Sequence, residues 1–409
     1  MTDSSTPVAG PRRAALAFIF VTVLLDMLGI GLMIPVLPKL VVAFKGGDTA
    51  AAAEVFGLFG TAWALMQFVF SPVQGALSDR FGRRAVILIS NLGLGLDYIL
   101  MALAPNLGWL FVGRVISGIT AASVSTSFAY IADVTPAEKR AASFGLIGMA
   151  FGVGFVLGPA VGGLLGSISL RLPFWGSAGL SLLNFCYGLL ILPESLPAER
   201  RAGFVWKRAN PIGSLLLLRG YPQLFGLAAV NFLHGLAHVA LPSTFVLYAG
   251  YRYGWDERTV GMTLAGVGVC SAIVQGGVVR PMVKRLGERS TMLIGLGCGG
   301  AGFAIYGLAP TGLVFCLGVP VMSLWGLANP AVQALMTRRV GPTEQGQLQG
   351  ALGSLQGVAG LIGPGLFTLT FAHFIAPGQS WQLPGAPFVL AALLLFAGTL
   401  VGARATRAG

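Results

Sequence analysis

The sequence predicts an all-α integral membrane protein with twelve transmembrane helices in two pseudo-symmetric six-helix bundles. Three observations support this fold class. The composition is too apolar to cover a water-facing surface, and the basic residues gather in alternate connecting segments. The second half of the chain also repeats the glycine and proline spacing of the first half.

The composition indicates that lipid is the main solvent of this chain. Hydrophobic residues make up 55% and charged residues only 10% of its 409 positions, and the mean hydropathy is +0.80. A soluble domain carries about 25% charged residues, because water must wet its surface. The 60 glycines fit the same interpretation, since small residues let membrane helices approach closely where no hydrophobic force drives them together. This composition excludes a soluble enzyme.

The net charge of +12 reports on membrane topology. Of the 26 Lys and Arg residues, 20 fall in segments that would share one side of the membrane. Cytoplasmic loops carry such an excess of basic residues. We therefore expect both termini in the cytoplasm, an even number of spans and no nucleic-acid partner. The basic residues of the opposite loops are Lys39, Lys45, Arg171, Arg252 and Arg258.

The spans are read from apolar runs, each of about 20 residues or more. The longest connection, 194–220, combines Pro, Gly and basic residues, so it predicts a cytoplasmic linker. The expected domains are therefore a first six-helix bundle at 1–195, a linker at 196–220 and a second bundle at 221–409. The predicted spans are 14–39, 54–77, 84–104, 107–132, 140–167, 172–193, 221–249, 257–284, 290–309, 311–338, 347–375 and 384–403.

An internal duplication relates the two halves. A Gly-Pro pair occurs at Gly158-Pro159 in the fifth span and at Gly363-Pro364 in the eleventh, an offset of 205 residues. Many secondary transporters are built from such repeats, with the substrate site between them near the midplane. The same offset carries Gly145, Gly148 and Gly152 onto Gly350, Gly353 and Gly357, and Arg80-Phe81-Gly82 onto Arg285-Leu286-Gly287.

The most specific local signal is the string GALSDRFGRR at 75–84, between the second and third spans. Its glycines permit a tight turn at the membrane surface, and its aspartate can pair with neighbouring arginines. An ordinary basic loop that only anchors topology is the alternative interpretation. The residues of interest are Gly75, Asp79, Arg80, Gly82, Arg83 and Arg84.

Charged residues inside predicted spans are the candidates for proton coupling. Asp26, Asp97 and Arg114 lie well inside apolar runs. Such residues are costly in lipid, so they usually face an interior cavity and serve a function. Desolvation favours the neutral form of a carboxyl group, whereas a nearby guanidinium favours the charged form. An acid that gains and loses an arginine neighbour would therefore bind and release a proton, although a permanent structural Asp–Arg pair is the alternative.

The intramembrane acids fall in the first half of the chain, so we expect proton coupling there and mainly substrate contacts in the second half. Asn231, His234 and His238 are spaced to share one face of the seventh span. They are candidates for the cavity wall, with helix–helix hydrogen bonding as the alternative role. Further polar candidates for the cavity are Gln67, Gln275, Asn329, Gln333 and Gln356.

The 75–84 string resembles the signature loop of the major facilitator superfamily, in which it acts as a cytoplasmic gate. The run from Phe111 to Gly118 is similar to the buried-arginine motif of that superfamily. The fifth span looks like the motif associated with its antiporters, although close helix packing alone could explain the glycines. The residues of that motif are Gly154, Gly158, Pro159, Gly162 and Gly163.

The first span and the pattern around Asp97 resemble bacterial tetracycline/H⁺ antiporters of the drug:H⁺ antiporter family with twelve spans. The resemblance implies a proton-coupled exporter of amphipathic drugs in the bacterial inner membrane, with both termini cytoplasmic. It implies no cofactor beyond the proton-motive force, although substrate can arrive as a metal chelate, and no obligatory protein partner. In those antiporters, acids at the positions of Asp26 and Asp97 are implicated in transport.

The match departs from the close antiporters in the ninth span, where they carry an acid and this chain has Gly299 or a neighbour. A histidine of their eighth span is also missing, although Gln275 matches a glutamine there. These departures put tetracycline itself in doubt. The alternative function is a proton-coupled nutrient or metabolite symporter on the same fold. We expect neither catalysis nor a protein-held metal, because the sequence contains no recognisable catalytic or metal-ligand motif.

Overall fold

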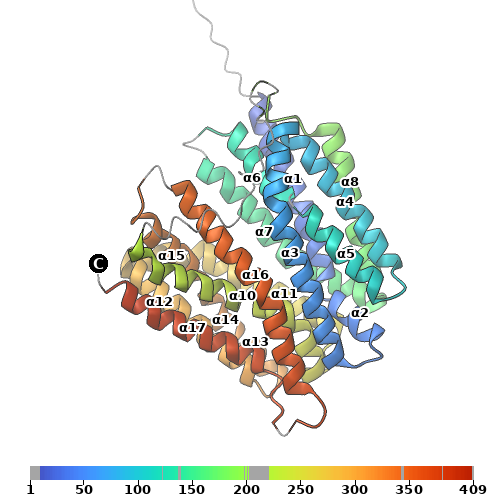
Figure 1. Ribbon diagram of the computed structural model, residues 1–409, viewed down its shortest axis with the longest axis vertical. Helices are drawn as coiled ribbons and strands as arrows, with labels where there is room; N and C mark the ends of the chain where they lie inside the picture. Colours follow the sequence, from blue (N-terminus) through green and yellow to red (C-terminus); the bar gives the residue numbers. More distant parts are fainter. Residues whose placement is uncertain are drawn as a thin grey trace, which may run out of the picture.

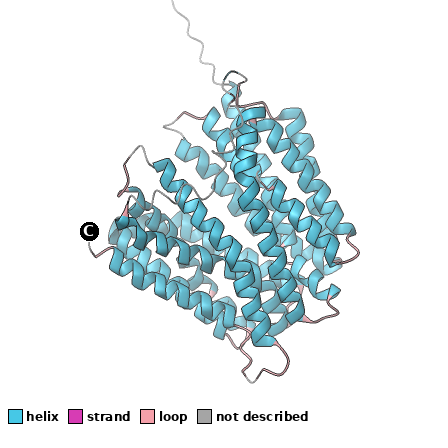
Figure 2. Ribbon diagram, in the orientation of Figure 1, coloured by secondary structure: helices cyan, strands magenta, loops and turns pink. Residues whose placement is uncertain are grey.

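The computed structural model describes residues 10–121, 123–136, 140–197, 199, 201, 221–341, 345–379 and 381–407. Within these ranges the chain is almost entirely helical and contains no strand (Figure 2). Most of the predicted linker at 196–220 lies outside the described residues.

The helices of the first half of the chain precede the predicted linker. They are drawn in blue to green in Figure 1. Their bounds are α1 Gly10–Met33, α2 Leu37–Phe44, α3 Thr49–Phe81, α4 Arg83–Leu103, α5 Leu107–Thr120, α6 Ser123–Val134, α7 Arg140–Ile168 and α8 Leu172–Ile191.

The second half begins with a short 3₁₀ turn, η5 (Pro222–Leu224), and continues in long helices, drawn in yellow-green to red in Figure 1. Its other irregular elements are a π-helical turn, η6 (Val274–Val278), and a 3₁₀ turn, η7 (Leu324–Leu327). The α-helices are α10 Phe225–Tyr253, α11 Glu257–Ile273, α12 Val279–Leu308, α13 Gly312–Leu317, α14 Val319–Ser323, α15 Ala328–Thr337, α16 Gln345–Ile375 and α17 Ala386–Ala405.

The described helices include ten stretches long and apolar enough to cross a membrane. Large apolar side chains also cover the outer surface, for example Leu190 at 81%, Ile168 at 75% and Leu313 at 72% exposure. Such a surface would aggregate in water but is solvated by lipid tails. These features are those of a multi-pass membrane protein.

The structure differs from the predicted spans at several places. The first span, 14–39, is not one helix, because the chain turns at 34–36 and resumes in α2. The fourth, 107–132, is divided between α5 and α6. The eighth and ninth lie in one 52-residue stretch, Glu257–Leu308. Twelve membrane crossings therefore remain a prediction.

The long stretch turns at Gly287, whose φ of 75° and ψ of 167° are not helical. Gly82, which ends α3 and precedes α4, has a similar backbone conformation with φ 102° and ψ 154°. The two glycines are related by the 205-residue offset found in the sequence. Both occupy a region that is essentially restricted to glycine, so the duplication extends to the backbone of this turn.

Two helix pairs form the main junction between the halves. Helix α7 packs against α11, and α3 packs against α16. The offset carries α7 onto α16 and α3 onto the α11 region, so the two contacts are the same contact repeated by the pseudo-twofold relation. Figure 1 shows the two sets of helices converging where α3 and α16 lie together and diverging from there. The space that becomes the candidate site lies along this junction.

We predict that Gly287→Ala lowers the stability of the protein through backbone strain alone. No described atom lies within 4 Å of a Cβ at this position, so the added methyl group meets no clash. The glycine-only conformation should cost about 1–3 kcal/mol for alanine. The melting temperature of the purified protein in detergent measures the effect. Gly297→Ala, in α12 and also without a described neighbour within 4 Å, is the matched control and should not lower it. Equal melting temperatures for the two variants would contradict the prediction.

Candidate functional site

A cavity of about 930 Å³ lies between the two halves. Its wall is formed by α3, α5 and α6 on one side and by α10 and α16 on the other. Small-molecule sites typically have volumes of about 300–1,000 Å³, so the cavity can hold one drug-sized compound. Its apolar lining is largely aromatic and comes from Phe56, Trp63, Phe68 and Phe128.

The polar groups of the cavity include several of the predicted candidates. Gln67 and Arg114 line it from the first half, and His238 and Gln356 line it from the second. Of the residues that form this wall, only Arg114 and His238 are titratable. The other polar side chains of the wall are the hydroxyl groups of Ser71, Ser243 and Ser354.

The cavity is closed at the end that carries the α1–α2 turn and the start of α11. Lys39 donates a hydrogen bond to the carbonyl oxygen of Trp255 over 2.7 Å. The same ammonium group lies 3.2 Å from Oε1 of Glu257. Both side chains of this ion pair are less than 20% exposed, at 18% and 19%. Lys39 belongs to the first half and Glu257 to the second, so the pair joins the halves directly.

The glycines predicted as an antiporter motif lie behind this closure. A Cβ at Gly158 would lie 2.6 Å from Cα of Gly31 in α1. A Cβ at Gly163 would lie 3.1 Å from Cα of Gly261 in α11. Helix α7 therefore touches both α1 and α11 backbone to backbone, and any larger residue would separate them. Gly154 and Gly162 pack against Met27 and Leu32 of α1, and Pro159 lies inside α7.

The opposite end, which carries the start of α1, the end of α17 and the Gly82 turn, is not packed in this way. At Gly145, Gly148 and Gly152 of α7, no described atom lies within 4 Å of the position that a Cβ would occupy, and the same holds for Gly353 and Gly360 of α16. Gly353 also lines the cavity. A Cβ at Gly357 of α16, in contrast, would lie 2.6 Å from the ring of Phe68 in α3. The repeated helices are thus packed backbone to backbone toward the Lys39 end, and the structure is closed at that end.

Asp26 is buried in α1 at 3% exposure. Its Oδ1 accepts a hydrogen bond of 2.8 Å from Nδ2 of Asn184 in α8. The same amide group donates to the carbonyl oxygen of Thr22 over 2.9 Å. A helix–helix hydrogen bond in lipid thus fixes the carboxyl group against α8, away from the residues that line the cavity.

Asp97 is even more buried, at 1% exposure in α4. Among the described residues, neither of its carboxyl oxygens has a hydrogen-bond partner. Arg114 is near enough to interact with Asp97 electrostatically but forms no hydrogen bond with it. Its guanidinium lies over the indole of Trp63, 5.5 Å from the ring centre. No ion pair joins Arg114 to an acid within the described part of the chain. A permanent Asp–Arg pair, the alternative considered from the sequence, is absent from this state.

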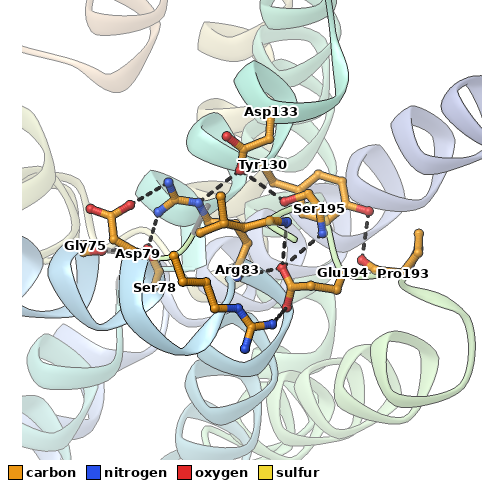
Figure 3. A network of polar contacts seen from close by, with 11 residues as sticks. Gly75, Ser78, Asp79, Arg83, Tyr130, Asp133, Pro193, Glu194 and Ser195 are labelled. Atoms are coloured by element: carbon orange, nitrogen blue, oxygen red, sulfur yellow. Dashed lines mark hydrogen bonds and ion pairs between the residues drawn. The ribbon is translucent and has the colours of Figure 1, made fainter. Parts of the chain in front are cut away.

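The 75–84 loop is held by a network centred on Arg83 (Figure 3). Nη2 of Arg83 lies 2.6 Å from Oδ1 of Asp79, and Nε lies 3.1 Å from Oδ2 of Asp133 in α6. Nη1 donates to the hydroxyl group of Ser78, which itself donates to the carbonyl oxygen of Gly75. One guanidinium therefore ties the ends of α3, α4 and α6 together.

The segment after α8 completes the network. Oε1 of Glu194 accepts hydrogen bonds from the backbone amides of Arg83, Ser195 and Leu196 over 2.9–3.0 Å. A carboxylate at the start of α4 also interacts favourably with the helix dipole. Arg84 donates to the carbonyl oxygen of Leu189 over 2.6 Å, and Arg80 stacks on Phe81 at 5.1 Å. All these partners belong to the first half of the chain.

The predicted polar stripe lies on α10. Only His238 of its three residues lines the cavity. Its neighbour His234 stacks on Trp325 of η7 with the ring centres 4.6 Å apart, and His238 lies 5.6 Å from the same indole. Asn231 is buried, and its carbonyl oxygen accepts a hydrogen bond of 3.4 Å from Nε2 of Gln356.

The other candidates lie outside the cavity wall. Gln275 is in the π-helical turn η6, near Gly326. Asn329 and Gln333 are in α15. At Gly299 a Cβ would lie 2.6 Å from Cδ1 of Trp325, so the indole occupies the space of a side chain at 299.

Several residues of the site were missed by the sequence reasoning. Asn184 is a polar residue in an apolar run, and that signal could have been noticed. Lys39 and Glu257 were recognised only as loop charges, because their pairing depends on the packing of the two halves. Trp63 and Trp325 read as ordinary apolar residues. Glu194 had been included only as part of a linker.

Comparisons with known proteins agree with these observations. The family model described as Major Facilitator Superfamily matches residues 19–364. The class C tetracycline resistance protein of Escherichia coli is 39% identical over 383 residues, which cover 93% of this chain and 94% of that protein. The class G protein of Vibrio anguillarum is 37% identical over 363 residues, covering 87% and 90%.

A solved structure adds agreement on the fold. The human organic anion transporter MFSD10 superposes with a TM-score of 0.70, covering 96% of this chain and 99% of that one. Its sequence identity of 24% makes this a likeness of fold alone.

We predict that Lys39→Gln opens the closed end of the cavity. The variant loses the ion pair and a charge-assisted hydrogen bond, and a loss of about 1–2 kcal/mol changes a population ratio by a factor of about 5–30. The readout is the rate at which a maleimide labels Val36→Cys, introduced into a protein without its native cysteines. Val36 is fully buried in this state, so faster labelling reports opening.

Lys39→Arg is the conservative control for this measurement and should label more slowly than Lys39→Gln. The exchanged pair Lys39→Glu with Glu257→Lys should return labelling toward the original rate. Unchanged labelling in Lys39→Gln would show that the ion pair does not hold the closure.

We also predict that Arg83→Lys destabilises the loop network almost as much as Arg83→Gln. A lysine keeps the charge but lacks the planar fork that reaches Asp79, Asp133 and Ser78 together. Melting temperature in detergent measures the effect. Arg84→Lys is the matched control, because Arg84 makes only one described hydrogen bond, to a backbone carbonyl. A wild-type melting temperature for Arg83→Lys would mean that charge alone suffices.

Proposed function

The chain belongs to the major facilitator superfamily, and on that premise we propose that it exports drugs, tetracyclines among them, in exchange for protons. The observation that carries the proposal is the cavity between the two repeats, with Arg114 in its wall and two acids buried in the helices of the first half. The tetracycline resistance proteins, which align along nearly their whole length, supply the substrate class.

The cavity suits an amphipathic compound with fused or linked rings. Four aromatic residues offer ring faces, and Gln67, Gln356 and three serines offer hydrogen bonds. Few groups in the wall are charged. A bound drug therefore displaces water from few charged side chains, which keeps the cost of desolvating the wall low. A divalent-cation chelate of tetracycline is included among the candidate substrates. The metal ion would then be cargo, and no resident cofactor is proposed.

Proton coupling is assigned to Asp97, Asp26 and Arg114. Asp97 has no described hydrogen-bond donor, and a buried carboxyl group in that position is favoured in its neutral, protonated form. Arg114 can turn from Trp63 toward Asp97, which would favour the charged form and release the proton. Movement of this guanidinium between the indole and the carboxyl group is therefore the proposed coupling step.

Transport then follows an alternating-access cycle. The present state is closed where Lys39 meets Glu257, and we assign that end to the outside of the cell. The end with the termini and the Gly82 turn is assigned to the cytoplasm, as the distribution of basic residues predicts. Substrate enters from the cytoplasm, the halves rock about the α7–α11 and α3–α16 contacts, and the cavity opens outward. A bacterial inner membrane is the proposed location.

The proton-motive force supplies the energy. Each charge that moves inward through the membrane potential contributes about 2.3 kcal/mol per 100 mV. No nucleotide is required, since the sequence has no phosphate-binding loop of the GxxxxGK[ST] type. One polypeptide chain with a small-molecule substrate is sufficient for this cycle, and no protein partner is proposed.

The test uses inverted membrane vesicles loaded with a pH-sensitive dye. After a pH gradient is established, adding tetracycline should release protons from vesicles that contain the wild-type protein. Asp97→Asn and Asp26→Asn should lower this release to the background level, because an amide cannot carry the proton. Asp48→Asn is the matched control: Asp48 caps α3 by accepting from Ala51 N, and asparagine caps equally well.

The two outcomes separate the functions considered. Drug-induced proton release that depends on Asp97 supports antiport. No response to tetracycline or to a panel of other amphipathic drugs would contradict export, and proton movement together with an added nutrient would identify a symporter instead.

A further inference from the structure

The two histidines of α10 share one aromatic partner. His234 and His238 are one helical turn apart, and Trp325 contacts both rings at 4.6 and 5.6 Å between centres. His238 is exposed to the cavity, whereas His234 lies behind it. Nδ1 of His234 and Nε1 of Trp325 are buried and have no hydrogen-bond partner among the described residues. Buried polar atoms are rarely left in this state, so the cluster requires an explanation.

The packing around Trp325 is specific to this cluster. Cδ1 and Cγ of the indole would lie 2.6 and 2.7 Å from a Cβ at Gly299 in α12. On another side, the ring centre of Phe303 lies 5.5 Å away. The indole is therefore wedged between α12 and α10. It presents a π-face to two rings that can each become a cation.

The charges around the cluster are sparse. On the elements packed against α10, the charged or titratable residues of the described structure lie toward helix ends. The two imidazoles flank the same indole, so a proton on one disfavours a proton on the other. Across the cavity, Arg114 is the other cationic group of the wall. The charged or titratable residues of these elements are Lys39 on α2, Glu54, Asp79 and Arg80 on α3, His373 on α16, Arg404 on α17, and Tyr248, Tyr251, Arg252 and Tyr253 on α10 itself.

We propose that His238, supported by Trp325 and backed by His234, is a second proton-binding site, located in the second half of the chain and occupied in competition with the transported drug. The competition with a drug rests on the proposed function, whereas the proton site itself does not. Of the residues that line the cavity, His238 is the only imidazole, the side chain whose ordinary titration range lies nearest neutral pH. Water in the cavity supplies the proton to one imidazole nitrogen, and the indole face stabilises the resulting cation.

Protonation changes what the cavity offers to a ligand. Neutral His238 presents one hydrogen-bond donor and one acceptor, whereas the protonated ring presents two donors and a positive charge. The protonated ring repels a cationic drug or metal chelate. It also has no acceptor nitrogen left for a hydrogen bond donated by the drug. Proton binding and drug binding at this position are mutually exclusive, and by linkage each weakens the other equally. The second half therefore contributes to coupling, in contrast to the expectation that it supplies mainly substrate contacts.

The first experiment follows the fluorescence of Trp325 in the purified full-length protein. Its emission is isolated as the difference between the wild type and Trp325→Phe, between about pH 5 and 8. An imidazolium in contact with an indole quenches its emission, so the signal should fall in one step on acidification. The step should disappear in His238→Gln. For this variant the Trp325 emission is the difference between His238→Gln and the double variant that also carries Trp325→Phe. His373→Gln replaces the third histidine, outside the cavity wall, and should retain it.

The second experiment measures equilibrium binding of labelled tetracycline with Mg²⁺ by dialysis. In the wild type, affinity should fall by up to about tenfold per pH unit on the acid side, the limit for one competing proton. His238→Gln and His238→Asn should bind with much less dependence on pH.

The outcomes separate the two proposals. An emission step that is absent, or that persists in His238→Gln, overturns the proton site. Equal pH dependence of binding in the wild type and His238→Gln overturns the competition. If tetracycline does not bind at any pH, the proposal that tetracyclines are among the exported drugs fails, while the emission titration still decides whether His238 binds a proton.

Discussion

The architecture depends on backbone contact between glycine-rich helices at one end of the molecule. In lipid, helices gain nothing from burying apolar surface against each other, so association relies on close packing. Gly163 and Gly261 supply it between α7 and α11, and the Gly60–Pro364 contact supplies it between α3 and α16. Because these contacts occupy only the Lys39 end, the helices diverge beyond them and enclose a cavity. The glycines thus decide both where the halves meet and where the substrate can sit.

The charged groups of the protein are arranged around this junction in two different ways. At the surfaces, charges are satisfied: Arg83 contacts two carboxylates and a hydroxyl group, and Lys39 pairs with Glu257. In the interior, Asp97 has no described hydrogen-bond partner and Arg114 rests on an indole ring. Surface networks hold a conformation, whereas an incompletely satisfied buried group is ready to change its protonation or its partner. The interior groups are therefore the ones that can couple ion movement to a change of shape.

Much of this organisation was predictable from the sequence. The apolar composition, the helices, the 205-residue repeat and the buried positions of Asp26 and Asp97 follow from residue type and spacing. The division of the fourth span into α5 and α6 did not, because no proline or charge marks the break near Ala121. The site was harder to predict. Gln67, His238 and Gln356 line the cavity, but Asn231 shares their polarity and is buried outside the cavity wall. Such differences depend on the rotation of each helix against its neighbours, which the sequence of one helix does not determine.

The capping of α4 by Glu194 has a consequence for how the protein is made. The amide of Arg83 and the carboxylate that accepts its hydrogen bond are 111 residues apart in the chain. At a synthesis rate of about 5–20 residues per second, roughly 6–22 s pass between the appearance of the turn and that of its cap. During this interval the ribosome continues to deliver α5 to α8 into the membrane, and the Gly82 turn stays open at its surface. The first half can thus complete this turn only when Glu194, three residues after the end of α8, has left the ribosome.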